Sequence, residues 1–416
     1  MTVRRAAISA PTFLSAVLVD AVGNGLFLPI SILYFTVVGK VGLGTVGILL
    51  SAASLLTLPL PILVGAMVDQ FGARPMVIAA HLVQAAGFVG YFAVGGPVTL
   101  AVFAGTVAVG QRVFWSSIFT LVSDVAATDQ GAVDRWFARV GMLRAAGYGL
   151  GALVTSAVLS IGSPLVYRLT ILANAASFLI AAGLIAVSTP HGRGGGPADR
   201  KKAGGYRILL ADRRFLGVVV ANYGFALCSV FLAIAVPVYV VDATSALKWV
   251  VGPLLAVSTA VLAVGQTIAV RMVRTVARTT VLAVSGVLWV GWSAGMALSS
   301  HLSGVGLVVL LFAATLCYTA AELLHNPVSN ALVRELSPAE FRGRYLAMFQ
   351  YSFTFATITA PALFTLSFGW WHTMPWIVLA VVAAVASVMM VTLRKSMPDS
   401  AVWPAGSRVA DEAGAM

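Results

Sequence analysis

The chain has few charged residues for its length. Only 10% of its 416 residues are Asp, Glu, Lys or Arg, whereas soluble globular domains carry about 25%. Hydrophobic residues make up 60% of the sequence, and together these proportions exclude a water-soluble enzyme. A membrane-spanning helix needs roughly 20 mostly apolar residues. About twelve such helices would therefore fill most of the chain and leave no room for a separate soluble domain.

Cysteines and catalytic motifs are also scarce. The two cysteines, Cys228 and Cys317, lie inside apolar runs, where a thiol behaves as a small hydrophobic side chain. We therefore expect no disulfide framework and no metal site. The sequence contains no Gly-x-x-x-x-Gly-Lys-Ser/Thr nucleotide loop and no nucleophile elbow. It predicts a protein that is not an enzyme, uses no cofactor and does not hydrolyse ATP.

Acidic residues are few as well. The 14 Asp and Glu stand against 26 Lys and Arg, which gives a formal net charge of +12. A nucleic-acid-binding protein would gather its basic residues on one face, but here they are spread over short segments between apolar runs. Membrane topology explains them better, and we expect no nucleic-acid partner.

The apolar runs, separated by polar residues or by Gly and Pro, predict twelve transmembrane helices. Six lie near residues 11–37, 45–68, 75–94, 98–124, 138–161 and 166–187. The other six lie near residues 215–240, 248–270, 279–298, 305–332, 345–368 and 374–393. The predicted fold class is an all-α membrane protein with twelve transmembrane helices in two pseudo-symmetric six-helix halves.

Lys and Arg are distributed unequally between alternate loops. Most of those outside the spans fall on one side, and the opposite side has only Lys40, Arg168 and Lys248. Positive charge stays on the cytoplasmic side during insertion, so we predict a multi-pass protein of the cell (inner) membrane with both termini cytoplasmic. Residues 188–214 are predicted to be a basic, flexible linker and residues 394–416 a cytoplasmic tail. Richness in Ala, Val and Gly points to a bacterial source.

An internal repeat supports the division into halves. With a shift of about 205 to 211 residues, residues 67–74 align with 272–278, and residues 120–124 align with 331–335. Each match is weak, but they occur in the same order and at the same places. Many secondary transporters are duplicated units of this kind, with the substrate site between the repeats. We place the N-terminal half at residues 1–187 and the C-terminal half at residues 215–393.

The loop after the second predicted span carries a recognisable motif. Gly65, Asp69, Gly72 and Arg74 follow the pattern Gly-x-x-x-Asp-x-x-Gly-x-Arg, which resembles the cytoplasmic signature of the major facilitator superfamily. Gly65 would permit a close helix approach and Gly72 a turn with positive φ. Asp69 and Arg74 could form a charge network at the helix ends. The resemblance implies that Asp124 joins this network as a cytoplasmic gate; the alternative is a generic tight turn.

The loop before the eleventh predicted span supports the same resemblance. Residues 338–345 are similar to the Pro-x-x-x-Arg-Gly-Arg-Tyr loop found there in that family. The resemblance covers essentially the whole chain and is to the twelve-span drug/proton antiporter type. One departure is that antiporters commonly carry a Gly-Pro motif in span five, whereas residues 141–151 contain no proline. This departure weakens a specific assignment as a drug antiporter.

Three charged residues lie deep in predicted spans: Asp20, Arg112 and Glu322. At 1.5 Å per residue they lie about 14, 18 and 15 Å from the cytoplasmic ends, and such costly charges mark functional sites. The resemblance implies that they face one another across a central cavity, where Arg112 could hold Asp20 or Glu322 ionised. A static salt bridge is the alternative. Arg144, nearer a helix end, is expected to be structural, with its head group reaching the interface.

Uncharged polar and aromatic residues on the same spans are further candidates for lining the cavity. Taken singly, each fits helix packing or interhelical hydrogen bonding better, and only their concentration on these spans favours a cavity. They are Asn24, Trp115, Phe119, Asn222, Tyr223, Tyr318, His325, Asn326, Gln350 and Tyr351.

Together with the resemblance, these patterns favour a proton-coupled exporter that moves an amphipathic small molecule by alternating access. Asp20 and Glu322 would accept the protons. We expect a monomer that contacts membrane lipid. One alternative is a proton-coupled importer of a nutrient or siderophore, although Asn and Gln are few on the lining helices. Another is a non-transporting membrane sensor or assembly partner, which would have no reason to keep buried charges on three spans.

Overall fold

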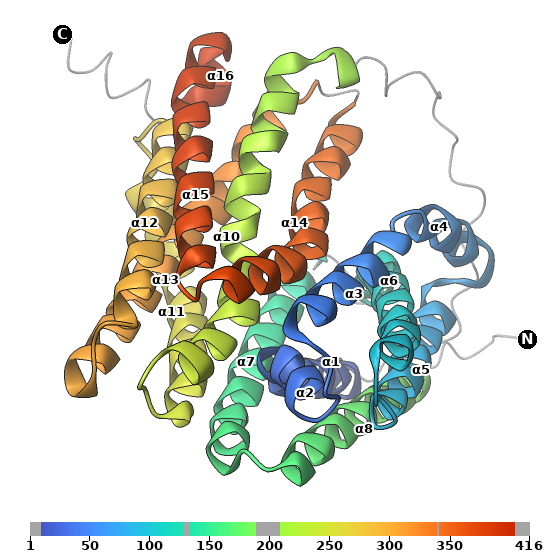
Figure 1. Cartoon of the computed structure of the whole chain (residues 1–416). Coiled ribbons are helices and arrows are strands. Elements are labelled where there is room, and N and C mark those ends of the chain that lie inside the picture. The colour runs from blue at the N-terminus through green and yellow to red at the C-terminus, as the bar shows by residue number, and fades with distance from the viewer. Residues whose placement is uncertain (1–9, 128–132, 189–208, 339–340, 404–416) are drawn as a thin grey trace, which may run out of the picture. The chain divides into compact units, whose positions relative to one another are not determined.

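The computed structural model describes residues 10–127, 133–188, 209–338 and 341–403, and the regular elements of these residues are helices (Figure 1). Up to residue 188 they are α1 (Ala10–Phe27), η1 (Leu28–Ile30), α2 (Ser31–Val37), α3 (Leu43–Leu56), α4 (Leu60–Phe71), α5 (Ala73–Tyr91), α6 (Pro97–Ala127), α7 (Val133–Ile161) and α8 (Pro164–Ser188). Beyond it they are α10 (Arg213–Ala243), η2 (Lys248–Val250), α11 (Val251–Met272), α12 (Arg278–Ser299), α13 (Gly304–Leu336), α14 (Arg342–Trp370), α15 (Met374–Leu393), η3 (Arg394–Ser396) and α16 (Asp399–Val402).

The chain divides into two compact units. Unit 1 comprises Met1–Arg200 and Leu247–Thr259, and unit 2 comprises Lys201–Ala246 and Ala260–Met416. The predicted halves differ from these units mainly in the segment Leu247–Thr259, which the sequence placed in the C-terminal half. Most of the predicted linker, and the tail beyond residue 403, lie outside the described residues.

Ten of the described helices are long and apolar enough to cross a membrane, which confirms the predicted all-α membrane protein. The other two predicted spans are not among these ten helices. The span predicted at 45–68 is broken into α3 and α4, because Pro59 and Pro61 lack the N–H groups that would continue the helical hydrogen bonds. The span predicted at 75–94 is α5, whose buried His81 and Gln84 make it less apolar than its neighbours.

Helices α1 and α7 of unit 1 cross with almost no side chain between them. A Cβ atom added to Gly147 would lie 2.6 Å from the Ala21 side chain, and one added to Gly151 would lie 2.4 Å from the Val22 carbonyl oxygen. Gly25 of α1 contacts the Tyr148 backbone equally closely. Residues 141–151, which lack the antiporter proline, therefore supply the glycines for this close approach, as small residues do in membrane helices.

Gly151→Ala should lower stability by about 1–3 kcal/mol, since the added methyl group forces α1 and α7 apart. Gly65→Ala is the matched control, because a Cβ atom there meets no heavy atom of the described residues within 4 Å. Unfolding of the detergent-solubilised variants, followed by circular dichroism, measures the difference. Equal unfolding curves for the two variants would contradict the close crossing.

Unit 2 is built around buried tryptophans. Helix α10 packs against α14 and α15, and α12 packs against α13 and α15, as Figure 1 shows for α12 and α15. Trp289, Trp292 and Trp376 are fully buried between these helices. After α15 the chain returns to α12, where Arg278 donates hydrogen bonds to the Ser400 and Ala401 carbonyls at 3.0 and 2.8 Å. The first residues of the predicted tail are therefore anchored to unit 2.

Candidate functional site: a buried ion pair beside an aromatic cavity

A buried ion pair joins α1 to α7. Arg144 Nη1 lies 3.0 Å from Asp20 Oδ2, and Asn24 Nδ2 donates to Asp20 Oδ1 at 3.0 Å. Only 4% of the Asp20 side chain and 14% of the Arg144 side chain are exposed. Arg112 was expected to be the partner of Asp20, but its Nε donates to Thr57 Oγ1 at 3.4 Å. The role falls to Arg144 because α7 is the helix that packs closely on α1, whereas α6 places Arg112 beside α3.

The Arg144 guanidinium is enclosed by aromatic rings. Its central carbon lies 4.6 Å from the centroid of the Trp115 ring and 5.5 Å from that of Phe114, distances at which a cation is attracted to a ring face. Its Nη2 approaches the Tyr148 hydroxyl at 3.5 Å. The expectation that Arg144 reaches the membrane interface is therefore wrong: Asp20 and the rings hold its head group inside unit 1.

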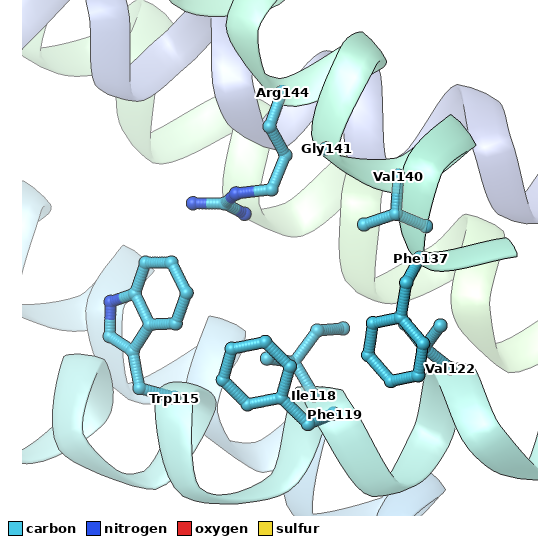
Figure 2. A pocket seen from close by; sticks show the side chains of 8 residues that line it. All are labelled: Trp115, Ile118, Phe119, Val122, Phe137, Val140, Gly141 and Arg144. Carbon is cyan, nitrogen blue, oxygen red and sulfur yellow. The ribbon is translucent and has the colours of Figure 1, made fainter. Parts of the chain in front are cut away.

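A cavity of about 270 Å³ lies between α6 and α7, with Arg144 in its wall. Figure 2 shows Arg144 extending from α7 toward Trp115 on α6. The described lining residues are Trp115, Ile118, Phe119, Val122, Phe137, Val140, Gly141 and Arg144. Two of the predicted lining residues, Trp115 and Phe119, are thus in the wall of an aromatic cavity with one cationic group.

A second, much smaller cavity also has Arg144 in its wall. It has a volume of about 10 Å³, and its polar lining residues are Asp20, His81 and Arg144. The two cavities share Ile118, Val140 and Arg144. His81 was not among the predicted site residues. An imidazole in an apolar span was the available signal, since ionisable groups inside membrane helices are rare and usually functional.

In unit 2 the buried carboxyl group is Glu322 of α13, which is 5% exposed. The Ser229 hydroxyl of α10 donates to Glu322 Oε1, and Asn326 Nδ2 donates to Oε2 at 2.7 Å. The Tyr318 hydroxyl donates to the Ser229 carbonyl at 2.7 Å. Among the described residues, the hydrogen-bond partners of Glu322 are therefore neutral, in contrast to those of Asp20.

The remaining polar candidates of unit 2 mostly join helices to one another. His325 Nε2 and Asn222 Oδ1 are 2.8 Å apart, and Asn222 Nδ2 donates to the Ser352 hydroxyl at 2.6 Å. The Tyr223 hydroxyl lies 2.9 Å from that of Thr359. These contacts link α10 to α13 and α14. They match the interhelical hydrogen bonding that the sequence favoured for each of these residues taken singly. Gln350 and Tyr351 are exposed on α14.

The predicted gating loop has the expected turn, and one contact of its arginine reaches α8. Gly72 has a φ of 88°, which confirms the positive φ predicted for it. Arg74 donates a hydrogen bond to the Ala186 carbonyl near the end of α8, where a cation is favoured by the helix dipole. Asp69 and Asp124 are exposed. Their charge network with Arg74 stays a prediction.

The close helix approach predicted at Gly65 is not found. A Cβ atom added there meets no described heavy atom within 4 Å. Other glycines of unit 1 do permit close approaches, among them Gly147 and Gly151 between α1 and α7 and Gly87 and Gly110 between α5 and α6. A motif glycine therefore does not by itself identify a packing contact, because its face of the helix must also meet a neighbour.

Many apolar spanning helices, buried acids on α1 and α13 and an aromatic cavity are features of a polytopic transport protein. The comparison with known families agrees: the profile of the Major Facilitator Superfamily matches residues 13–323. The chain belongs to this superfamily, whose members are transporters, and this membership confirms the prediction that it is not an enzyme.

Curated relatives match only part of the chain. Multidrug resistance protein MdtH of Edwardsiella ictaluri (strain 93-146) is 30% identical over 207 residues, 49% of this chain and 50% of the relative. MdtH of Yersinia pestis (strain Pestoides F) is 29% identical over 207 residues, which again cover 49% of this chain and 50% of the relative. The chain spans about half the length of the curated relatives it matches.

Solved structures match the fold over almost the whole chain. A crystal structure of the nucleoside transporter NupG superposes with a TM-score of 0.76 at 14% identity, covering 92% of this chain and 98% of that one. A crystal structure of the peptide transporter POT in complex with sulfate gives a TM-score of 0.71 at 16% identity, covering 92% and 94%. At these identities the likeness establishes the major facilitator fold.

Proposed function

We propose that this transporter is a proton-coupled exporter of an amphipathic, aromatic small molecule. It would work in a bacterial cell membrane as a monomer with both termini cytoplasmic. The observation that carries the proposal is the buried Asp20–Arg144 ion pair, whose Arg144 side chain lies in the wall of an aromatic cavity. The name of the MdtH relatives, multidrug resistance protein, supports export as the direction.

The ion pair can couple a proton to the shape of the cavity. While Asp20 is ionised, it holds the Arg144 guanidinium at 3.0 Å, and the guanidinium in turn lies against Trp115. A proton on Asp20 removes the negative charge that attracts Arg144. The guanidinium is then held mainly by its contacts with the aromatic rings. Arg144 and Trp115 both line the larger cavity. Proton binding at Asp20 therefore changes the wall of that cavity.

Glu322 is the second proposed proton acceptor. An ionised carboxylate is costly in a water-poor interior unless a cation or several hydrogen bonds offset its desolvation. Glu322 has hydrogen bonds from Ser229 and Asn326, so its carboxyl group can be held in either protonation state. In the alternating-access cycle, Asp69, Arg74 and Asp124 are the proposed cytoplasmic gate.

The cavity also favours a class of substrate. None of its eight described lining residues is acidic, and its one charged group is the Arg144 cation. A permanently cationic molecule would meet repulsion from Arg144, whereas a neutral aromatic molecule can stack on Trp115 and Phe119. The volume of about 270 Å³ lies just below the range of about 300–1,000 Å³ that is typical of small-molecule pockets. We therefore propose a small, neutral amphipath as the preferred substrate.

Inside-out membrane vesicles with an acidic lumen test both direction and substrate class. A neutral fluorescent aromatic amphipath should accumulate in the lumen more strongly than its quaternary ammonium analogue. Trp115→Ala should reduce this accumulation about tenfold, equivalent to about 1.4 kcal/mol of lost binding. Phe355→Ala is the control, because this exposed aromatic residue of α14 is not among the cavity's lining residues.

Two other results would replace the proposal. Proton-driven accumulation in right-side-out vesicles, with none in inside-out vesicles, would identify an importer. Binding of the amphipath without transport in either orientation would favour a membrane sensor. Preference for the cationic analogue would contradict the proposed substrate class.

A further inference from the structure

His81 is a buried titratable residue for which the proposed transport cycle has so far no role. It lies on α5 with 1% of its surface exposed. Its ring packs between Phe114 of α6, at 5.1 Å between centroids, and Phe178 of α8, at 5.8 Å. Its Nδ1 atom is buried and has no hydrogen-bond partner among the described residues. Such atoms are uncommon in folded proteins, and each calls for an explanation.

The small cavity that His81 lines has the right size and polarity for one water molecule. Its volume is about 10 Å³, close to the 10–15 Å³ that a single buried water requires. A buried water also needs two to four polar partners, and the cavity offers the side chains of Asp20, His81 and Arg144. The other described lining residues are apolar: Ala16, Val17, Phe114, Ile118, Val140 and Ile185.

Among the described residues that line this cavity, the charged groups come from two helices. Helix α1 contributes Asp20 and α7 contributes Arg144, while α6 and α8 present apolar and aromatic side chains to the cavity. Asp20 accepts hydrogen bonds from Asn24 and Arg144 at 3.0 Å. A carboxylate has about four lone-pair positions, so it can accept a further hydrogen bond from a water in the cavity.

We propose that one water bridges His81 and Asp20, so that the proton site of unit 1 is the group Asp20, Arg144 and His81. The water donates one hydrogen to the Asp20 carboxylate and the other to the imidazole nitrogen of His81. An incoming proton passes through this water to Asp20, whose carboxylate then releases Arg144. His81 is a positioning residue: it holds the water against the carboxylate. This inference rests on the proposed proton coupling at Asp20.

The Trp115 ring is a built-in reporter of this site, because it lies against the Arg144 guanidinium. Protein labelled with 5-fluorotryptophan would give ¹⁹F signals from its nine tryptophans, and Trp115→Phe assigns the relevant signal. In wild-type protein without substrate, the Trp115 signal should titrate with pH. In Asp20→Asn this transition should be absent.

His81→Phe keeps the ring contacts but removes the hydrogen-bond acceptor. The titration midpoint of the Trp115 signal should rise by about one pH unit, a tenfold change in proton affinity, because the ionised carboxylate loses the water held beside it. His81→Gln, which retains an acceptor, should shift the midpoint less and provides a second test if the phenylalanine variant does not fold. His301→Gln is the control, because His301 is exposed, and its titration midpoint should match that of the wild type.

A midpoint that is unchanged in both His81 variants would overturn the proposal and leave His81 as a packing residue. This outcome is distinct from failure of the proposed function. The titration requires no substrate, so proton exchange at the site can be present even if transport is not coupled to protons.

Discussion

Arg144→Gln should lower the free energy of unfolding by about 3–5 kcal/mol and abolish transport, because it leaves the Asp20 carboxylate buried without its cation. Asp20→Asn should also reduce stability. The double variant Asp20→Asn/Arg144→Gln removes both charges and should recover most of the lost stability while remaining inactive. Titration with a denaturing detergent, combined with substrate uptake, measures the two effects in the same preparations.

The thermodynamic cycle built from these variants isolates the interaction between the two side chains. Arg168→Gln provides a matched control, because Arg168 is an exposed arginine of unit 1 that lies over the Phe92 ring and should change stability by less than about 1 kcal/mol. If Arg144→Gln lowered the free energy of unfolding as little as Arg168→Gln, the buried ion pair would not stabilise the site as proposed.

Glu322→Gln should abolish proton-driven accumulation while leaving substrate binding within a few-fold of wild type. The amide is close in shape to the carboxyl group and can still accept the hydrogen bond from Ser229, but it cannot exchange a proton. Substrate exchange across the membrane without a gradient should persist, because that process does not require net proton movement. Comparing exchange with gradient-driven uptake in the same proteoliposomes separates the two steps.

Glu335→Gln is the appropriate control, since Glu335 is exposed on the same helix, α13. It should behave as wild type in both assays. Loss of exchange together with accumulation in Glu322→Gln would instead indicate that Glu322 binds substrate or holds the fold. Retention of both activities would remove Glu322 from the coupling mechanism.

The sequence predicted the helices well because their signal is local. Long apolar runs fix the spanning segments through the cost of placing polar groups in lipid, and the ten long apolar helices follow those runs. The same cost singled out Asp20 and Glu322, both of which are buried. The positive φ of Gly72 was also predictable, since it follows from a local turn motif.

Partners across helices were harder to predict. Whether Arg112 or Arg144 meets Asp20 depends on which helix packs on α1, and that is decided by the glycines of α7 rather than by depth in the membrane. His81 was missed for a similar reason, because its importance depends on a cavity formed by four other helices. The close approach predicted at Gly65 has no counterpart among the described residues of unit 1, since a motif residue shows its packing role only when its neighbours are known.

The most direct test of proton-coupled transport is proton movement in proteoliposomes that contain a pH-sensitive dye. The purified protein would be challenged with neutral aromatic amphipaths and with lipophilic cations, comparing wild type with Asp20→Asn and Glu322→Gln. The proposal predicts substrate-dependent proton movement in wild type and its loss in both variants. Folded wild-type protein that carries substrate without moving protons would contradict it.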